Sequence, residues 1–122
     1  MKITARESGK CKILELDGRL ILGPDTTELR NAVHEAAINN PQKIILNLAQ
    51  VTYADSCGIG ELVRNYTQVR NLGGSLVLTN LPERVRKLLT IAKLAPIFEI
   101  FSNEEEAIAD SQENVMLRQM CG

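Results

Sequence analysis

The sequence predicts a single α/β domain with a mixed, mainly parallel sheet of about five strands and about four helices. Two apolar runs typical of buried strands, 43–48 and 75–79, alternate with helical patterns, and such alternation implies crossover connections between parallel strands. The 122 residues are enough for one hydrophobic core. We expect the domain to occupy residues 1–110. The pattern fades after it, so residues 111–122 are expected to be a C-terminal helix extension or a flexible tail.

The first half of the chain indicates a hairpin followed by a helix. We expect strands at 3–7 and 11–18 and a turn-rich apolar passage at 18–24. A helix should follow and run to about residue 39. A turn at Ser8 to Lys10 would join the two strands. Asp25, three residues before Glu28, resembles a capping box at the start of the helix, and Thr26 is the alternative cap.

The second half alternates strands with helices. The expected elements are a strand at 43–48, a helix at 58–72, a strand at 75–79, a helix opened by Pro82, a strand at 97–101 and a helix capped by Ser102 or Asn103. Gly73 and Gly74 supply a helix stop. The acids 104–106 favour the start of the last helix. Consecutive helical residues diverge around the axis, so we expect these acids to be solvated and not to bind a metal.

Composition argues against several classes of function. Fourteen basic and fifteen acidic residues give a net charge of −1, which disfavours nucleic acid and anionic lipid as partners. No apolar run approaches the roughly 18 residues of a membrane span, and charges interrupt the N-terminus too early for a signal peptide. We therefore expect a cytoplasmic protein. Cys11, Cys57 and Cys121 are far apart without a C-x-x-C motif, so neither a disulfide framework, a zinc site nor a cofactor is expected.

The turn around Ser56 carries most of the functional information. It follows the strand at 43–48 and precedes the helix at 58–72, so the Ser56 hydroxyl is expected beside unpaired backbone N–H groups. A helix N-terminus of this kind favours a phosphate without needing a metal or a basic cluster. Gly58 and Gly60 keep the approach clear for another molecule. The alternative is that Asp55 or Ser56 simply caps the helix.

Catalytic interpretations of this turn are weak. A hydrolase elbow requires G-x-S-x-G, but Ala54 stands where the first glycine belongs, and the sole histidine, His34, lies in a predicted helix. A reactive thiol at Cys57 is a rival, because a helix N-terminus lowers a thiol pKa. Asp55 opposes that effect and no resolving cysteine lies nearby in sequence, so we expect Cys57 to be a buried or half-buried packing residue. No nucleotide-binding loop is present. We therefore expect a protein that is not an enzyme.

The predicted topology places further residues around Ser56. Sites in open α/β sheets lie outside the carboxyl ends of the parallel strands. We therefore expect Ser56 at the centre of one edge, flanked by Asp25, Thr26, Asn80 and Leu81, with little basic charge nearby. A dianionic phosphate on Ser56 would repel an acidic partner surface or disturb a close apolar contact.

Residues 44–62, which include Asn47-Leu48 and then Asp55-Ser56-Cys57-Gly58-Ile59-Gly60, resemble the signature of STAS domains, and most of all that of bacterial anti-sigma-factor antagonists. The resemblance covers about residues 1–110. It implies that a cognate anti-sigma serine kinase binds the unphosphorylated protein, which displaces a sigma factor and so regulates transcription. Phosphorylation of Ser56 would then release the kinase, and a phosphatase would reset the cycle. The expected partner-binding residues are Asp25, Thr26, Asp55, Ser56, Cys57, Gly58, Ile59, Gly60 and Asn80.

Two positions depart from the family pattern. Cys57 stands where the family usually has Ser or Thr, and Ile21 stands where members often carry an acid after the residues that match Gly18 to Leu20. The nearest acid is Asp25. The alternative interpretation is therefore a non-phosphorylated STAS interaction subunit of a transport or signalling complex.

Overall fold

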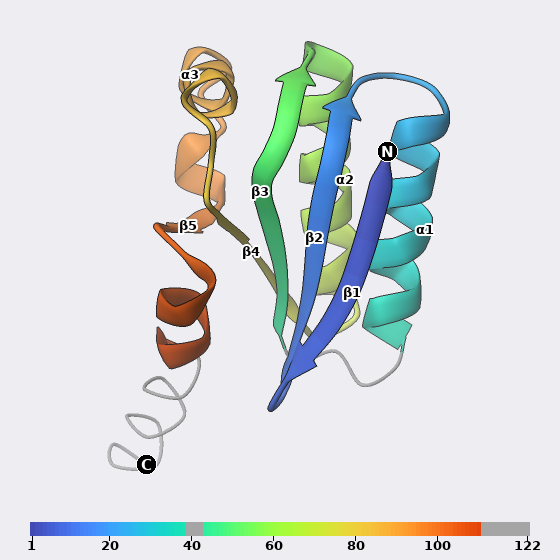
Figure 1. Ribbon diagram of the computed structural model, residues 1–122, viewed down its shortest axis with the longest axis vertical. Coiled ribbons are helices and arrows are strands. Elements are labelled where there is room, and N and C mark those ends of the chain that lie inside the picture. Colours follow the sequence, from blue (N-terminus) through green and yellow to red (C-terminus); the bar gives the residue numbers. More distant parts are fainter. Residues whose placement is uncertain (39–42, 111–122) are drawn as a thin grey trace.

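The computed structural model describes residues 1–38 and 43–110, apart from the Asp25 side chain. It confirms a single α/β domain with a mixed, mainly parallel sheet. In chain order the elements are β1 (Lys2–Ser8), β2 (Cys11–Leu20), α1 (Pro24–Ile38), β3 (Lys43–Ala54), α2 (Ser56–Asn71), β4 (Ser75–Thr79), α3 (Glu83–Ile91), the 3-10 helix η1 (Ala95–Ile97), β5 (Glu99–Phe101) and a helical segment at 104–110 (Figure 1).

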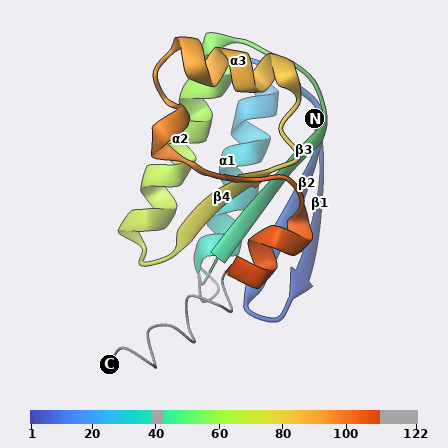
Figure 2. The ribbon, with the colours of Figure 1, turned by 90° about the vertical axis from the view of Figure 1, so that its left-hand side faces the viewer.

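The strands follow one another across the sheet in sequence order, β1-β2-β3-β4-β5. The β1–β2 hairpin is antiparallel, and the other three pairings are parallel. Alternate residues of a strand face opposite sides of the sheet. Leu46 therefore packs with α1 and α2, which lie together on one side (Figure 2), whereas Ile45 packs with Ala107 of the 104–110 segment on the other.

The strand β3 extends far beyond its neighbour β4. The last residues paired between them are Asn47 and Thr79, whereas pairing of β3 with β2 continues to Ala54 and Leu20. Residues 48–54 of β3 are therefore paired with β2 alone. At about 3.3 Å per residue, this overhang is roughly 20 Å long.

The start of α1 differs from the predicted capping box. The strand β2 continues to Leu20, and α1 begins at Pro24, so Asp25 and Thr26 lie within the first helical turn. The Gly23 carbonyl instead accepts hydrogen bonds from the Thr26 hydroxyl at 2.9 Å and from the Thr27 backbone N–H at 3.3 Å. Both proposed caps are therefore wrong, because a proline at the first helical position fixes the start one residue before Asp25.

Several other boundaries move by a few residues. The strand β3 runs to Ala54 instead of 48, α2 begins at 56 instead of 58, and η1 occupies the start of the strand expected at 97–101. Asn103 caps the last segment, because its Oδ1 accepts the Glu106 N–H at 2.9 Å. The predicted end of the first helix at 39–41 and the predicted tail at 111–122 lie outside the described residues. None of the described helices is long and apolar enough to cross a membrane.

Candidate functional site

The cap of α2 is Asp55, which resolves the choice between the two capping residues. Its backbone is extended, with φ of −115°, and its Oδ1 accepts the Gly58 N–H at 2.8 Å. Ser56 is the first residue of the helix and is exposed. Within the described part of the chain, its hydroxyl has no hydrogen-bond partner. The Ser56 hydroxyl therefore faces solvent without a structural role.

The first turn of α2 also presents backbone donors. The Gly58 N–H is satisfied by the Asp55 side chain, and the Ile59 N–H donates to the Asp55 carbonyl at 3.0 Å. The first N–H groups of a helix have no intrahelical acceptor, and those of Ser56 and Cys57 contact no other acceptor among the described residues. Together with the helix dipole, these two donors make the turn tolerant of negative charge.

Gly58 is required by a close approach of β2. A Cβ atom at this position would lie 1.9 Å from the Leu20 carbonyl oxygen, which also accepts the Asp55 N–H at 3.2 Å. Gly60 differs, because a Cβ there would have no atom within 4 Å. The first glycine is therefore fixed by the fold, whereas the second leaves open space at the surface.

The start of α1 lies at the same end of the sheet as Ser56, because Leu20 pairs with Ala54. Asp25 and Thr26 belong to the first turn of α1, and Figure 1 shows the start of α1 at the same end of the sheet as the start of α2. The Thr26 side chain is only 5% exposed and bonds to Gly23, so it stabilises the loop and is not presented to a partner.

Asn80 does not join this site. It follows Thr79, which pairs with Asn47, so the β3 overhang places it roughly 20 Å from Ser56. Asn80 instead lines a small polar pocket with Asn47, Asn103, Glu104 and Glu105. Leu81 follows Asn80 and is partly buried against the hydrophobic core, so it is not presented beside Ser56. The prediction that the ends of β3 and β4 share one edge is wrong, because β3 continues for several residues beyond the last residue of β4 along the strand direction.

The exposure of the motif residues also differs from expectation. Cys57 is exposed, which contradicts its predicted packing role. Ile59 is only 2% exposed and belongs to the core, so it supports the site from below. Leu22, in the loop before α1, is 72% exposed. The accessible surface at this end therefore includes Ser56, Cys57, Gly60 and Leu22.

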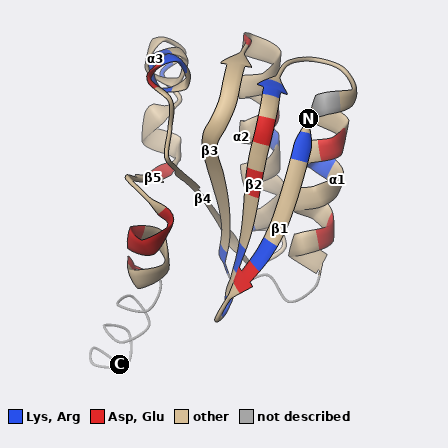
Figure 3. Cartoon of the chain, in the orientation of Figure 1, with Lys and Arg blue, Asp and Glu red and all other residues tan. Residues whose placement is uncertain are grey.

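Basic charge near the site was not expected and is present. Arg19 is paired with Tyr53 across β2 and β3, two residues before Asp55. The Arg84 guanidinium of α3 lies 5.9 Å from the centre of the Tyr53 ring. Blue segments at the end of β2 and on α3 mark this charge in Figure 3. The prediction of little basic charge is therefore wrong, because α3 packs beside the overhang.

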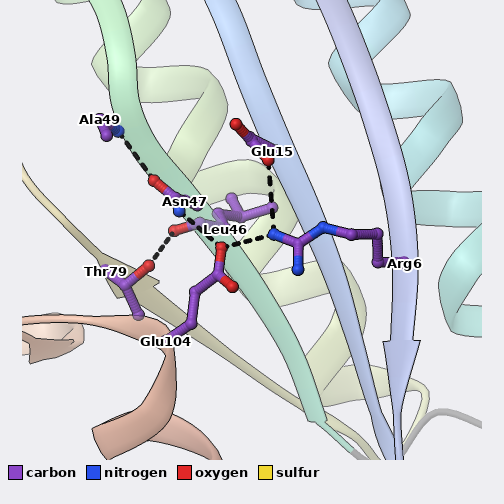
Figure 4. A network of polar contacts seen from close by, with 7 residues as sticks. All are labelled: Arg6, Glu15, Leu46, Asn47, Ala49, Thr79 and Glu104. Carbon is purple, nitrogen blue, oxygen red and sulfur yellow. Dashed lines mark hydrogen bonds and ion pairs between the residues drawn. The ribbon is translucent and has the colours of Figure 1, made fainter.

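A cluster of hydrogen-bonded polar side chains, which the sequence did not predict, lies on the opposite side of the sheet from α1 and α2 (Figure 4). Glu104 accepts hydrogen bonds from Arg6 at 2.7 Å and from Asn47 at 2.6 Å, and Arg6 also contacts Glu15 at 3.4 Å. Burial raises the pKa of Glu104, but the hydrogen bonds from Asn47 and Arg6 outweigh it and lower the pKa overall. Glu104 is therefore not a solvated helix residue.

Conventional catalytic groups do not converge on Ser56 among the described residues. His34 lies on α1, and its Nδ1 is 2.7 Å from Nε2 of Gln68, which is twelve positions after Ser56 on α2. At about 1.5 Å per residue, this places His34 roughly 18 Å away. No cluster of three or more His, Cys, Asp or Glu side chains that could hold a metal occurs in residues 1–38 or 43–110.

These features, a mixed sheet with an exposed serine at the start of its second helix, agree with the match to a family model. The model for the STAS domain matches residues 2–107, so the chain belongs to the STAS family. Two of its relatives are anti-sigma-factor antagonists. The anti-sigma-B factor antagonist of Bacillus subtilis is 39% identical over 61 residues, which are 50% of this chain and 56% of that protein. The anti-sigma F factor antagonist of Paenibacillus polymyxa is 27% identical over 100 residues, or 80% and 84% of the two chains.

The same fold is found in the solved structure of the anti-sigma factor antagonist SpoIIAA in its unphosphorylated form. That structure has a TM-score of 0.76 and 22% identity, over 92% of this chain and 97% of the other. At this level of identity the likeness concerns the fold alone.

Proposed function

We propose that the protein is an anti-sigma-factor antagonist that acts by partner switching. It binds an anti-sigma serine kinase while Ser56 is unmodified and leaves the kinase once Ser56 carries a phosphate. It acts as a ligand and substrate in the cytoplasm, catalyses no reaction itself and needs no cofactor, and a phosphatase restores the unmodified form. The observation that carries this proposal is the Ser56 hydroxyl, which is exposed and unengaged because Asp55 supplies the cap.

The surroundings of Ser56 support a switch. A phosphate adds a charge of about −1.5 to −2 at neutral pH. It would lie beside Asp55 on a surface that also presents the exposed apolar side chain of Leu22. Such a charge is costly to desolvate against a partner, so binding should weaken when the phosphate is added.

The proposal is tested with an anti-sigma serine kinase identified as a binding partner of this protein. Incubation with this kinase and ATP is expected to add one phosphoryl group by intact mass in the wild type and none in Ser56→Ala. Thr52→Ala, which removes another exposed hydroxyl from the overhang, is the matched control and should be phosphorylated normally. Phosphate that persists in Ser56→Ala would show that the site is assigned wrongly.

The same proteins separate the two interpretations of the family resemblance. Ser56→Asp is expected to weaken kinase binding at least tenfold by surface plasmon resonance, an effect of about 1.4 kcal/mol. A non-phosphorylated interaction subunit would bind its partner equally well with Ser, Ala or Asp at this position. Equal affinities would therefore favour that alternative over partner switching.

A further inference from the structure

A groove lies between the end of β3 and α3. It exists because β4 ends at Thr79, so the overhang of β3 has no strand on that edge, and α3 lies beside it instead (Figure 2). We call it the Tyr53 groove. Its lining residues are Tyr53, Ala54, Glu83, Arg84, Lys87 and Leu88. Tyr53 is 46% exposed and lies three residues before Ser56, so the groove begins within a few residues of the candidate phosphorylation site.

The Tyr53 groove carries positive charge that the described carboxylates do not pair with. Arg84 and Lys87 are three residues apart and share one face of α3, and Arg19 approaches from β2 through its pairing with Tyr53. None of these three cations forms an ion pair with a described residue. Glu83, at the start of α3, is the single carboxylate of the lining.

The chemistry of the groove indicates what would fit it. Guanidinium groups bind carboxylates in a bidentate manner, and partly exposed Tyr and Arg side chains are frequent binding hot spots. The half-buried Leu88 and the Tyr53 ring provide an apolar floor between the cations. The matching ligand is therefore a short acidic segment with an apolar side chain.

We propose that the Tyr53 groove binds an acidic segment of the partner that docks on Ser56. The identity of that partner as a kinase rests on the function proposed above, whereas the recognition of acidic peptide by the groove does not. A phosphate on Ser56 lies at the same end of the sheet, so it repels the acidic segment and competes with it for the cations. The groove thus supplies the attraction that phosphorylation cancels.

The test compares two arginines of the same helix. The full chain, labelled with ¹⁵N, is titrated with a synthetic Glu-rich peptide that contains leucine, and amide shifts are followed by NMR. We expect shifts confined to Arg19 and to residues 53–55 and 83–88. Arg84→Glu should weaken binding at least about tenfold, because a paired charge becomes a repulsive one. Arg86→Glu makes the same charge change at an exposed position outside the groove lining and should stay within about twofold.

The outcomes separate this inference from the proposed function. Equal losses in the two variants, shifts elsewhere on the protein, or a response to phosphatidylglycerol vesicles in place of peptide would each overturn the acidic-segment assignment. If the peptide result holds but Arg84→Glu and Arg86→Glu bind the kinase alike, the occupant is not the kinase. Failure of the kinase to phosphorylate Ser56 would instead overturn the proposed function, and the peptide titration does not depend on it.

Discussion

Substitution of Gly58 by alanine tests how closely α2 is seated on β2. The added Cβ would lie 1.9 Å from the Leu20 carbonyl oxygen and 2.6 Å from its carbonyl carbon. Leu20 is fully buried, so it cannot turn away into solvent. A normal carbon–oxygen contact is about 3.3 Å, so the first turn of α2 must move by roughly 1.4 Å.

The cost follows from what this movement disturbs. Overpacking costs about 1–3 kcal/mol, and stretching the hydrogen bond from the Asp55 N–H to Leu20 costs about 1 kcal/mol more. Alanine is favoured over glycine within a helix by about 0.5–1 kcal/mol. The net expectation for Gly58→Ala is a loss of about 1–3.5 kcal/mol in the free energy of unfolding.

Urea unfolding followed by far-UV circular dichroism measures this loss. Gly60→Ala is the matched control, since the same change two residues further on meets no atom within 4 Å. It is expected to stabilise the protein by about 0.5–1 kcal/mol. The reasoning fails if Gly58→Ala unfolds within about 0.5 kcal/mol of the wild type, or if the two variants shift stability in the same direction.

Three further predictions concern side chains away from this contact. Glu104→Gln should lose about 1 kcal/mol of stability at pH 7. Because the folded-state pKa of Glu104 is lowered, the stabilisation by its carboxylate is present above the unfolded pKa of about 4.3 and disappears as pH falls through the folded-state pKa. The stabilities of the two proteins in urea unfolding should therefore converge in acid. In a variant without the third cysteine, a thiol reagent should modify exposed Cys57 in the native protein and buried Cys11 only after unfolding, and rapid loss of both thiols would contradict this burial. Arg30→Ala should lower the melting temperature in thermal unfolding, because it leaves the carboxylate of Glu61, 4% exposed, without its cation, and the further change Glu61→Gln should recover part of the loss.

The sequence predicted the order and type of the elements because the signals for them are local. The apolar run at 43–48 and the glycines that end α2 identify their elements without knowledge of the rest of the chain. The bounds of β3 are different. Residues 49–54 lack a continuous apolar pattern, and they form a strand because β2 pairs with them. Pairing of this kind is not encoded in the segment itself.

The same distinction applies to the candidate site. Ser56 was placed correctly at the strand–helix junction, since both neighbouring elements have local signals. The choice of Asp55 as the cap could not be made, because both residue types are good caps. The remoteness of Asn80 depends on strand register, and the contact between Arg6 and Glu104 joins residues 98 positions apart. These features require the assembled sheet.

Because Asp55 is the cap of α2, the proposed phosphorylation of Ser56 would leave the helix start intact. Removing or modifying the Ser56 side chain takes no hydrogen bond away from α2, since the Asp55 carboxylate holds the helix start. The phosphorylated and unphosphorylated forms would then share one backbone conformation and unfold at comparable rates. The phosphate would be a removable group on a rigid surface, and a partner that recognises it would need no refolding of this protein. The rate of signalling would be set by the enzymes that add and remove the phosphate, and by how fast the complexes dissociate.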